Sequence, residues 1–153
     1  MTAIDLTSSI SPSLVPTWHA SEARVSFRQP VSRSGFVDAG WWPRSWDLTA
    51  ELPPLLDVLW TAGRDVNRVL YNLDFWEAAP RHLAVESRTV RLGGFRRQDP
   101  LMVSFVDAWG RERIDVLVVD PHTEPEVALR ALALASRADS TDRPGRIMEL
   151  AAQ

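Results

Sequence analysis

A chain of 153 residues has the length of a single domain, and its 17 basic residues against 20 acidic ones give a net charge of −3. This slight acidity argues against binding to nucleic-acid phosphates, which requires a clustered excess of positive charge. Because the sequence has no cysteine, disulfides, thiolate nucleophiles and cysteine-ligated zinc are excluded.

The N-terminal residues 1–22 are rich in Ser, Thr and Pro, and their apolar residues follow no period, which is typical of a flexible arm. The first five residues lack the basic start and apolar run of a signal peptide. No apolar segment reaches the roughly 20 residues that a membrane helix requires. We therefore expect a cytoplasmic protein that makes no membrane contact.

The first structured element is expected at residues 23–28, where apolar and polar residues alternate as in a half-buried strand. Residues 40–48 follow after a loop and read GWWPRSWDL. They hold three of the seven tryptophans and lead into the strongest helical pattern of the chain.

The helical pattern predicts a buried leucine face and defined ends. Asp47 is a plausible N-cap. Pro53 and Pro54 would interrupt a helix that began there, so we expect a short turn over 47–51 and a main helix starting near Pro53. Gly63 is expected to end the helix in the left-handed conformation.

From residue 66 the period changes to that of strands joined by short turns. The expected strands are 66–74, 82–85, 89–92, 101–107 and 113–119. The last of these carries apolar residues on both of its faces, which indicates a central strand that is buried on both sides.

The remaining segments are a glycine-containing loop, a second helix and the C-terminal tail. Residues 93–100, which contain two adjacent glycines, are expected to form a loop. A helix over 124–136 is expected to begin with a capping box formed by Thr123 and Glu126. The tail over 137–153 reads as a flexible linker that ends in a short C-terminal helix.

These elements predict an α+β fold rather than an alternating βαβ fold. The expected architecture is a mainly antiparallel sheet of about five or six strands with two helices packed on one face. The domain organisation is then a flexible N-terminal arm over 1–22, a single α+β domain over 23–136 and a flexible tail over 137–153.

The candidate binding residues centre on the adjacent Trp41 and Trp42. Successive side chains of an extended backbone point to opposite sides, so we expect one of these indoles to be exposed beside Arg44. An exposed indole next to a guanidinium suits a planar or anionic ligand, or anchors a protein interface. The competing interpretation places these tryptophans in the core between sheet and helix.

A second cluster would complete this binding surface if its loop lies near residues 41–46. It consists of Trp76, Arg91, Arg96, Arg97, Gln98 and Asp99, of which Trp76, Arg96 and Asp99 are the candidate binding residues. All 17 basic residues are arginine, which a GC-rich genome explains and which bidentate recognition of carboxylate or phosphate would also favour.

No catalytic or cofactor motif supports an enzymatic reading. The three histidines have no metal-ligand spacing, and neither a nucleophile elbow nor a phosphate-binding loop is present, so we expect no metal and no cofactor. A pair of carboxylates such as Asp38 and Asp74 is the remaining option for acid–base chemistry.

Three functions follow from these residues. The leading hypothesis is a non-catalytic binding or regulatory module whose Trp/Arg surface takes an unknown protein or a small anionic or planar ligand. The alternative is a small hydrolase or a sugar- or nucleotide-processing enzyme that uses Asp38 or Asp74 with an arginine clamp. The third, a nucleic-acid binder using Arg91, Arg96 and Arg97, is disfavoured by the net charge.

Several strings across residues 23–136 resemble a family of small actinobacterial proteins catalogued as a domain of unknown function. The most specific strings are WWPRS at 41–45 and RLGGF at 91–95, with GFVD at 35–38 and QDP at 98–100. The family often has Asp-Gly-Ala where this chain has Asp-Ala-Gly at 38–40, which would move a glycine with positive φ by one residue. The resemblance implies no activity, cofactor or catalytic residue.

Overall fold

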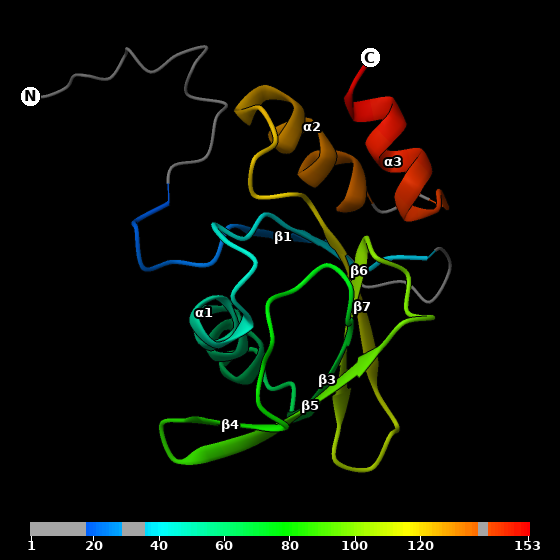
Figure 1. The fold of residues 1–153 in the computed structure, drawn as a ribbon. Coiled ribbons are helices and arrows are strands. Elements are labelled where there is room, and N and C mark those ends of the chain that lie inside the picture. The colour runs from blue at the N-terminus through cyan, green and yellow to red at the C-terminus, as the bar shows by residue number, and fades with distance from the viewer. Residues whose placement is uncertain (1–17, 29–35, 138–140) are drawn as a thin grey trace, which may run out of the picture.

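The computed structural model describes residues 18–28, 36–137 and 141–153. The described residues form an α+β fold of three helices and a seven-stranded sheet (Figure 1). In chain order the elements are β1 (Val25–Phe27), β2 (Ala39–Trp41), α1 (Leu48–Thr61), β3 (Val66–Asn72), β4 (His82–Val85), β5 (Arg88–Phe95), β6 (Met102–Asp107), β7 (Arg113–Val118), α2 (Pro125–Ala135) and α3 (Pro144–Ala151).

The sheet is mixed, with the strand order β1-β2-β7-β6-β3-β5-β4. The β4–β5 and β6–β7 hairpins are confirmed as antiparallel pairs, whereas β2 pairs with β7 and β3 pairs with β5 in parallel. The predicted count of five or six strands is therefore too low. It missed β2, because three residues are too short to show a period-2 pattern.

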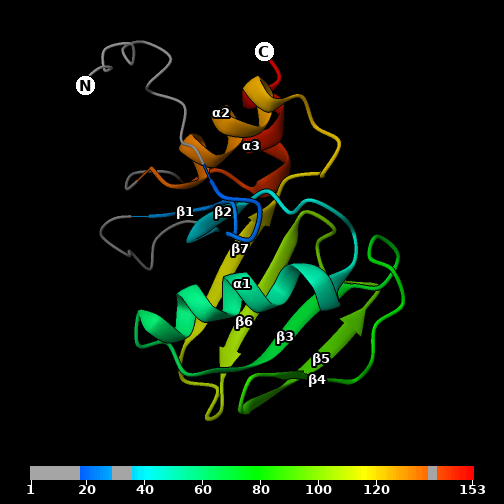
Figure 2. The ribbon, with the colours of Figure 1, turned by 90° about the vertical axis from the view of Figure 1, so that its left-hand side faces the viewer.

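Helices cover both faces of the sheet, so the prediction of two helices on one face is wrong. α1 packs on a core that includes Val116 and Val118 of β7. α2 and α3 pack on a second core that includes Leu117, which lies between those two valines and points to the other face. Figure 2 shows α1 lying across the front of the strands, with α2 and α3 above β1 and β2.

α1 runs without a break from Leu48, so the expected interruption before Pro53 is wrong. Asp47 is the N-cap, as predicted, and its side chain accepts a hydrogen bond from the Thr49 N–H at 3.0 Å. Pro53 and Pro54 lie inside the helix and remove two backbone donors. Five fully buried leucines offset this loss: Leu48, Leu52, Leu55, Leu56 and Leu59. Gly63 follows the helix with φ +87°, as predicted.

Two local predictions in the second half are also wrong. Residues 93–95 continue β5 instead of starting a loop, and Gly94 pairs with Tyr71 of β3. Neither Gly93 nor Gly94 has positive φ. The N-cap of α2 is Glu124, which makes no side-chain cap hydrogen bond, so the predicted capping box at Thr123 does not form.

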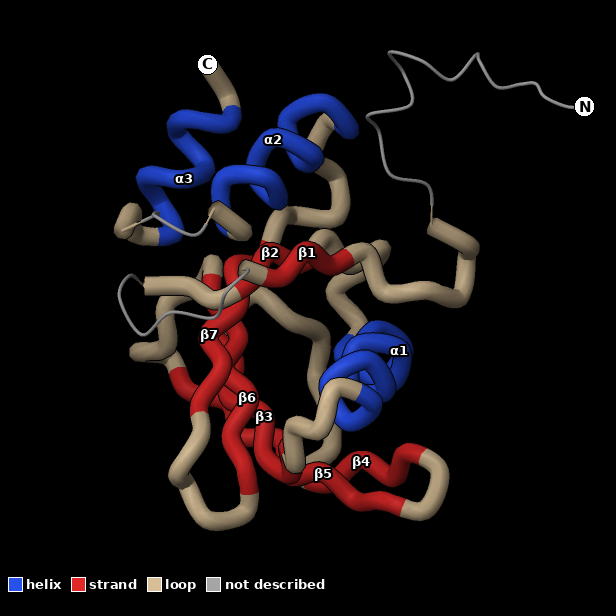
Figure 3. Tube along the Cα trace, turned by 180° about the vertical axis from the view of Figure 1, so that it is seen from behind, coloured by secondary structure: helices blue, strands red, loops and turns tan. Residues whose placement is uncertain are grey.

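The C-terminal helix α3 packs against α2 (Figure 3). Its Ile147 is fully buried, and Arg130 of α2 donates from Nε to the Ala151 carbonyl at 2.8 Å. At the other terminus, most of the predicted arm lies outside the described residues. Among the described residues, no helix combines the length and apolar character needed to span a bilayer.

Candidate functional site

Trp41 and Trp42 are both buried, which corrects the expectation that one indole is exposed. Trp41 is 1% exposed in the core under α1, and Trp42 is 8% exposed in the core under α2 and α3. The adjacent side chains do point to opposite sides of the chain, as an extended backbone requires. Because helices cover both sides, the pair belongs to two cores and offers no exposed ring.

The guanidinium beside Trp42 belongs to Arg24 instead of Arg44. It lies over the indole at 3.7 Å from the ring centroid, a cation–π contact. Its Nε donates to the Trp42 carbonyl at 2.8 Å and its Nη2 to the Pro43 carbonyl at 2.9 Å. Burial, and then the charge of Arg44, lower the pKa of Arg24. Arg24 therefore covers the indole that the sequence suggested was available to a ligand.

Arg44 is exposed and holds the segment before β1 against the domain. Its Nη1 donates to the Glu22 carbonyl at 2.6 Å and its Nη2 to the His19 carbonyl at 2.9 Å. Its backbone N–H donates to the Glu51 carboxylate at 2.9 Å. The side chain is thus engaged by main-chain oxygens and has a positioning role.

We expect Arg44→Ala to leave the fold intact and to release residues 19–22. A hydrogen bond contributes about 0.5–1.5 kcal/mol, so the loss of the two that the Arg44 side chain donates should lower stability by about 1–3 kcal/mol. Amide hydrogen exchange at Glu22, whose N–H donates to the His19 carbonyl, should become faster by about tenfold. Arg68→Ala, at an exposed position on β3, serves as the control and should leave this exchange unchanged.

Trp41 instead takes part in an aromatic cluster with Trp46 and Trp76. Trp41 stacks on Trp76 with ring centroids 5.6 Å apart, and Trp46 meets Trp76 edge-on at 4.9 Å. The ring of the half-exposed Phe75 is tilted against that of Trp46, with centroids 6.2 Å apart. Within the described residues, the buried Nε1 atoms of Trp42 and Trp76 have no hydrogen-bond acceptor.

Residues 41–46, here called the Trp segment, and the chain after Phe95 lie at the same end of the sheet. The backbone N–H of Glu77 donates to the Trp46 carbonyl at 2.9 Å, which joins the Trp segment to the chain after β3. Asn72, at the end of β3, donates from Nδ2 to the Gln98 carbonyl at 2.6 Å. The buried Asn72 amide therefore positions the turn that carries Arg96. The sequence did not indicate this role, because Asn72 looked like an ordinary polar residue of a strand.

A cavity of about 330 Å³, here called the sheet-end cavity, opens between these segments. Trp76 and Tyr71 supply aromatic walls, and the half-exposed Leu73 stands at its edge. Its lining consists of Tyr71, Leu73, Asp74, Trp76, Glu77, Ala78, Ala79 and Arg96. Arg96 and Asp74 form an exposed ion pair across 3.9 Å. Two of the six candidate binding residues, Trp76 and Arg96, thus share one cavity.

The other candidates do not line this cavity. Asp99 is exposed and accepts from the Leu101 N–H at 2.9 Å, so its carboxylate shapes the turn before β6. Trp41 lies behind Trp76, and Trp42 faces the opposite core.

Asp38 and Asp74 cannot form the paired-acid centre of the hydrolase alternative. Asp38 precedes β2 and Asp74 follows β3, and three interstrand steps separate these strands. At about 4.8 Å per step, the lateral separation alone is roughly 14 Å, beyond the separations of about 5–9.5 Å that paired acids use.

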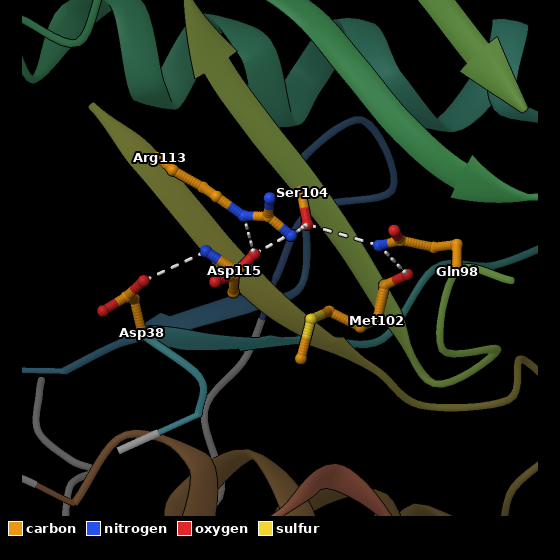
Figure 4. A network of polar contacts seen from close by, with 6 residues as sticks. All are labelled: Asp38, Gln98, Met102, Ser104, Arg113 and Asp115. Carbon is orange, nitrogen blue, oxygen red and sulfur yellow. Dashed lines mark hydrogen bonds and ion pairs between the residues drawn. The ribbon is translucent and has the colours of Figure 1, made fainter. Parts of the chain in front are cut away.

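A network of polar side chains lies on the sheet face opposite α1 (Figure 4). Ser104 donates to Asp115 Oδ1 at 2.6 Å, and Arg113 Nε donates to the same oxygen at 2.8 Å. Gln98 Nε2 reaches Ser104 Oγ at 3.2 Å. Ser104 is fully buried, so this network stabilises the sheet and presents no nucleophile to a substrate.

No metal centre is visible in the described part of the chain, since no three of its His, Asp or Glu side chains are grouped as ligands. A family model described as a family of unknown function (DUF5994) matches residues 24–135. Searches of curated proteins and of solved structures found no match. The match spans far more than half of the sequence and confirms the expected membership in a family of unknown function. The chain belongs to the family of unknown function DUF5994.

Proposed function

We propose that this chain is a protein-binding module that captures a basic side chain of a partner segment in the sheet-end cavity. The observation that carries the proposal is the lining of this cavity, where aromatic walls stand beside an excess of negative charge. The lining has two acidic residues, Asp74 and Glu77, and one basic residue, Arg96, so its formal net charge is −1. This sign favours a cation over the anionic ligand that the arginine-rich sequence suggested.

The long side chain of arginine or lysine matches both parts of the lining. Its apolar stem can lie along Leu73 and the aromatic walls, and its charged head can reach the rim carboxylates. A cation beside an aromatic ring gains further attraction from the ring quadrupole. Asp74 is already paired with Arg96, which leaves the exposed Glu77 as the carboxylate best placed to meet the partner.

The exposed apolar residues at the rim favour a protein partner over a small cation. Leu73, which lines the cavity, is 45% exposed, and the neighbouring Phe75, whose ring lies against Trp46, is 48% exposed. Large exposed apolar side chains next to a concave site are typical of protein interfaces. Phe95 is also half-exposed but belongs to the other face of the sheet, because it packs beside Gly93 whereas Leu73 packs beside Gly94.

The test is selection of random twelve-residue peptides on the purified chain, followed by affinity measurements. We expect the selected peptides to share a basic residue next to an apolar one. Glu77→Arg and Ala78→Trp, which reverse a rim charge and fill the cavity, should weaken their binding at least tenfold. Asp57→Arg on the exposed side of α1 and Ala84→Trp on β4 are the matched controls and should bind normally.

Two outcomes would contradict the proposal. Peptides without a common basic residue would show that the carboxylates do not select the partner. Equal affinity for the Glu77→Arg variant and the unchanged chain would place the binding surface elsewhere.

A further inference from the structure

A second cavity, of about 270 Å³, lies where the end of α1 approaches the starts of β2 and β7. We call it the α1–β2 cavity. It is separate from the sheet-end cavity, with which it shares no lining residue. Its lining consists of Phe27, Arg28, Asp38, Val58, Leu59, Ala62, Arg64 and Ile114. Its volume is near the lower end of small-molecule sites and suits a compact ligand.

The lining divides into an apolar part and a charged part. Phe27, Val58 and Ile114 provide an apolar wall drawn from three elements, with Val58 37% exposed at the outer side. One carboxylate and two guanidinium groups complete the lining, from Asp38, Arg28 and Arg64. A ligand that fills this cavity therefore needs an apolar portion together with charged groups.

One oxygen of the Asp38 carboxylate accepts a hydrogen bond from the protein, and the other is open to a ligand. Its Oδ2 accepts a hydrogen bond from the Asp115 N–H at 3.0 Å, which fixes the orientation of the group. Figure 4 shows the second oxygen pointing away from the polar network. Within the described residues nothing donates to this Oδ1, so it can accept from a ligand.

The two arginines differ in how they are held. The Arg28 side chain is fully buried and donates from Nη1 to the Val37 carbonyl at 3.3 Å. The Arg64 side chain is 31% exposed and pairs with the half-exposed Glu112 at 3.4 Å. An exposed pair of this kind contributes only about 0–1 kcal/mol, so Arg64 can exchange Glu112 for an anionic group of a ligand.

From this arrangement we propose that the α1–β2 cavity binds a free apolar amino acid. The ammonium group lies on Asp38, the carboxylate faces Arg64 and the side chain contacts the apolar wall. A simple carboxylic acid would meet repulsion from Asp38, and a simple amine would meet two guanidinium groups. A zwitterion satisfies both signs at once.

The environment of Asp38 makes this binding depend on pH. Burial raises the pKa of Asp38 above its ordinary value, and the charge of Asp115 on β7 raises it further. The Asp115 N–H, Arg28 after β1 and Arg64 after α1 oppose this rise in pKa. An ammonium group requires the ionised carboxylate, so affinity should fall as the pH is lowered through the raised pKa.

The experiment is titration calorimetry of the full chain with L-leucine, N-acetyl-L-leucine and L-leucinamide. We expect saturable binding of L-leucine and at least tenfold weaker binding of the two derivatives, which lack the ammonium or the carboxylate charge. Asp38→Asn should weaken leucine binding at least tenfold while its amide oxygen still accepts from Asp115. Val58→Trp should abolish binding by filling the outer part of the cavity, without altering Asp38.

Asp57→Asn, on the exposed side of the same helix, is the control and should bind leucine normally. Equal binding of N-acetyl-L-leucine and L-leucine would overturn the role of Asp38 and show a plain carboxylate site. Absence of saturable leucine binding, or unchanged binding by both cavity variants, would refute the site altogether. Peptide binding at the sheet-end cavity is measured separately, so failure here leaves that proposal untouched.

Discussion

Replacing Trp42 by alanine is expected to lower the free energy of unfolding by about 3–5 kcal/mol, the range for truncation of a buried aromatic side chain. The indole is 8% exposed and belongs to the core under α2 and α3, with Leu117 and Ala131 among its members. Removing it would also leave the Arg24 guanidinium without the ring that it covers. For a chain of this length, the midpoint of thermal unfolding should fall by about 10 °C or more.

Urea denaturation and thermal unfolding followed by circular dichroism would measure this loss. Trp109→Ala is the matched control, because Trp109 is 78% exposed and its loss should change stability by less than about 0.5 kcal/mol. Trp42→Phe should cost much less than Trp42→Ala, since it keeps most apolar contact and removes an N–H that lacks an acceptor among the described residues. Equal stabilities of the Trp42→Ala and Trp109→Ala variants would contradict the core position of Trp42.

The burial of both tryptophans follows from a signal that the sequence did contain. The strand at 113–119 was predicted to be apolar on both faces, and a strand of that kind needs cover on both. Helices on both faces meet this requirement. They place Trp41, at the end of β2, and Trp42, directly after it, in separate cores.

Local signals predicted the elements well, and long-range pairing was not predictable from them. The Asp47 cap, the Gly63 end of α1 and both hairpins depend on residues close in sequence. The parallel pairing of β2 with β7 joins segments about 77 residues apart, as the hydrogen bond from Asp115 to Asp38 illustrates. No periodicity within either segment reports such a partner.

The residues of the two cavities likewise differ in how far the sequence predicted them. The sequence singled out Trp76 and Arg96, which share the sheet-end cavity, because both were expected at the end of a strand or in the loop after Gly94. It gave no reason to join Arg28 with Arg64, which meet only where the end of α1 passes the end of β1. A cavity lined by residues of β1, α1 and β7 and by Asp38 before β2 can be recognised only from the tertiary structure.

Gly40→Val is expected to separate α2 from β2 and to cost about 2–3 kcal/mol, toward the upper end of overpacking penalties. A Cβ at this position would lie 2.9 Å from Leu132 Cδ2, 3.1 Å from Ala135 Cβ and 3.2 Å from Leu132 Cα. The leucine side chain could rotate away, but the contact with its Cα can be relieved only by moving the helix backbone. Gly40 does not have positive φ, so it serves close packing and not a left-handed turn.

Chemical denaturation would give the loss of stability, and amide hydrogen exchange would locate it. Protection should fall most in α2 and in α3, which packs on α2, while α1 on the other face keeps its protection. Gly145→Ala in α3 is the control, because a Cβ there meets nothing within 4 Å and alanine favours a helix by about 0.5–1 kcal/mol. A Gly40→Val variant as stable as the unchanged chain would show that α2 approaches β2 less closely than this packing requires.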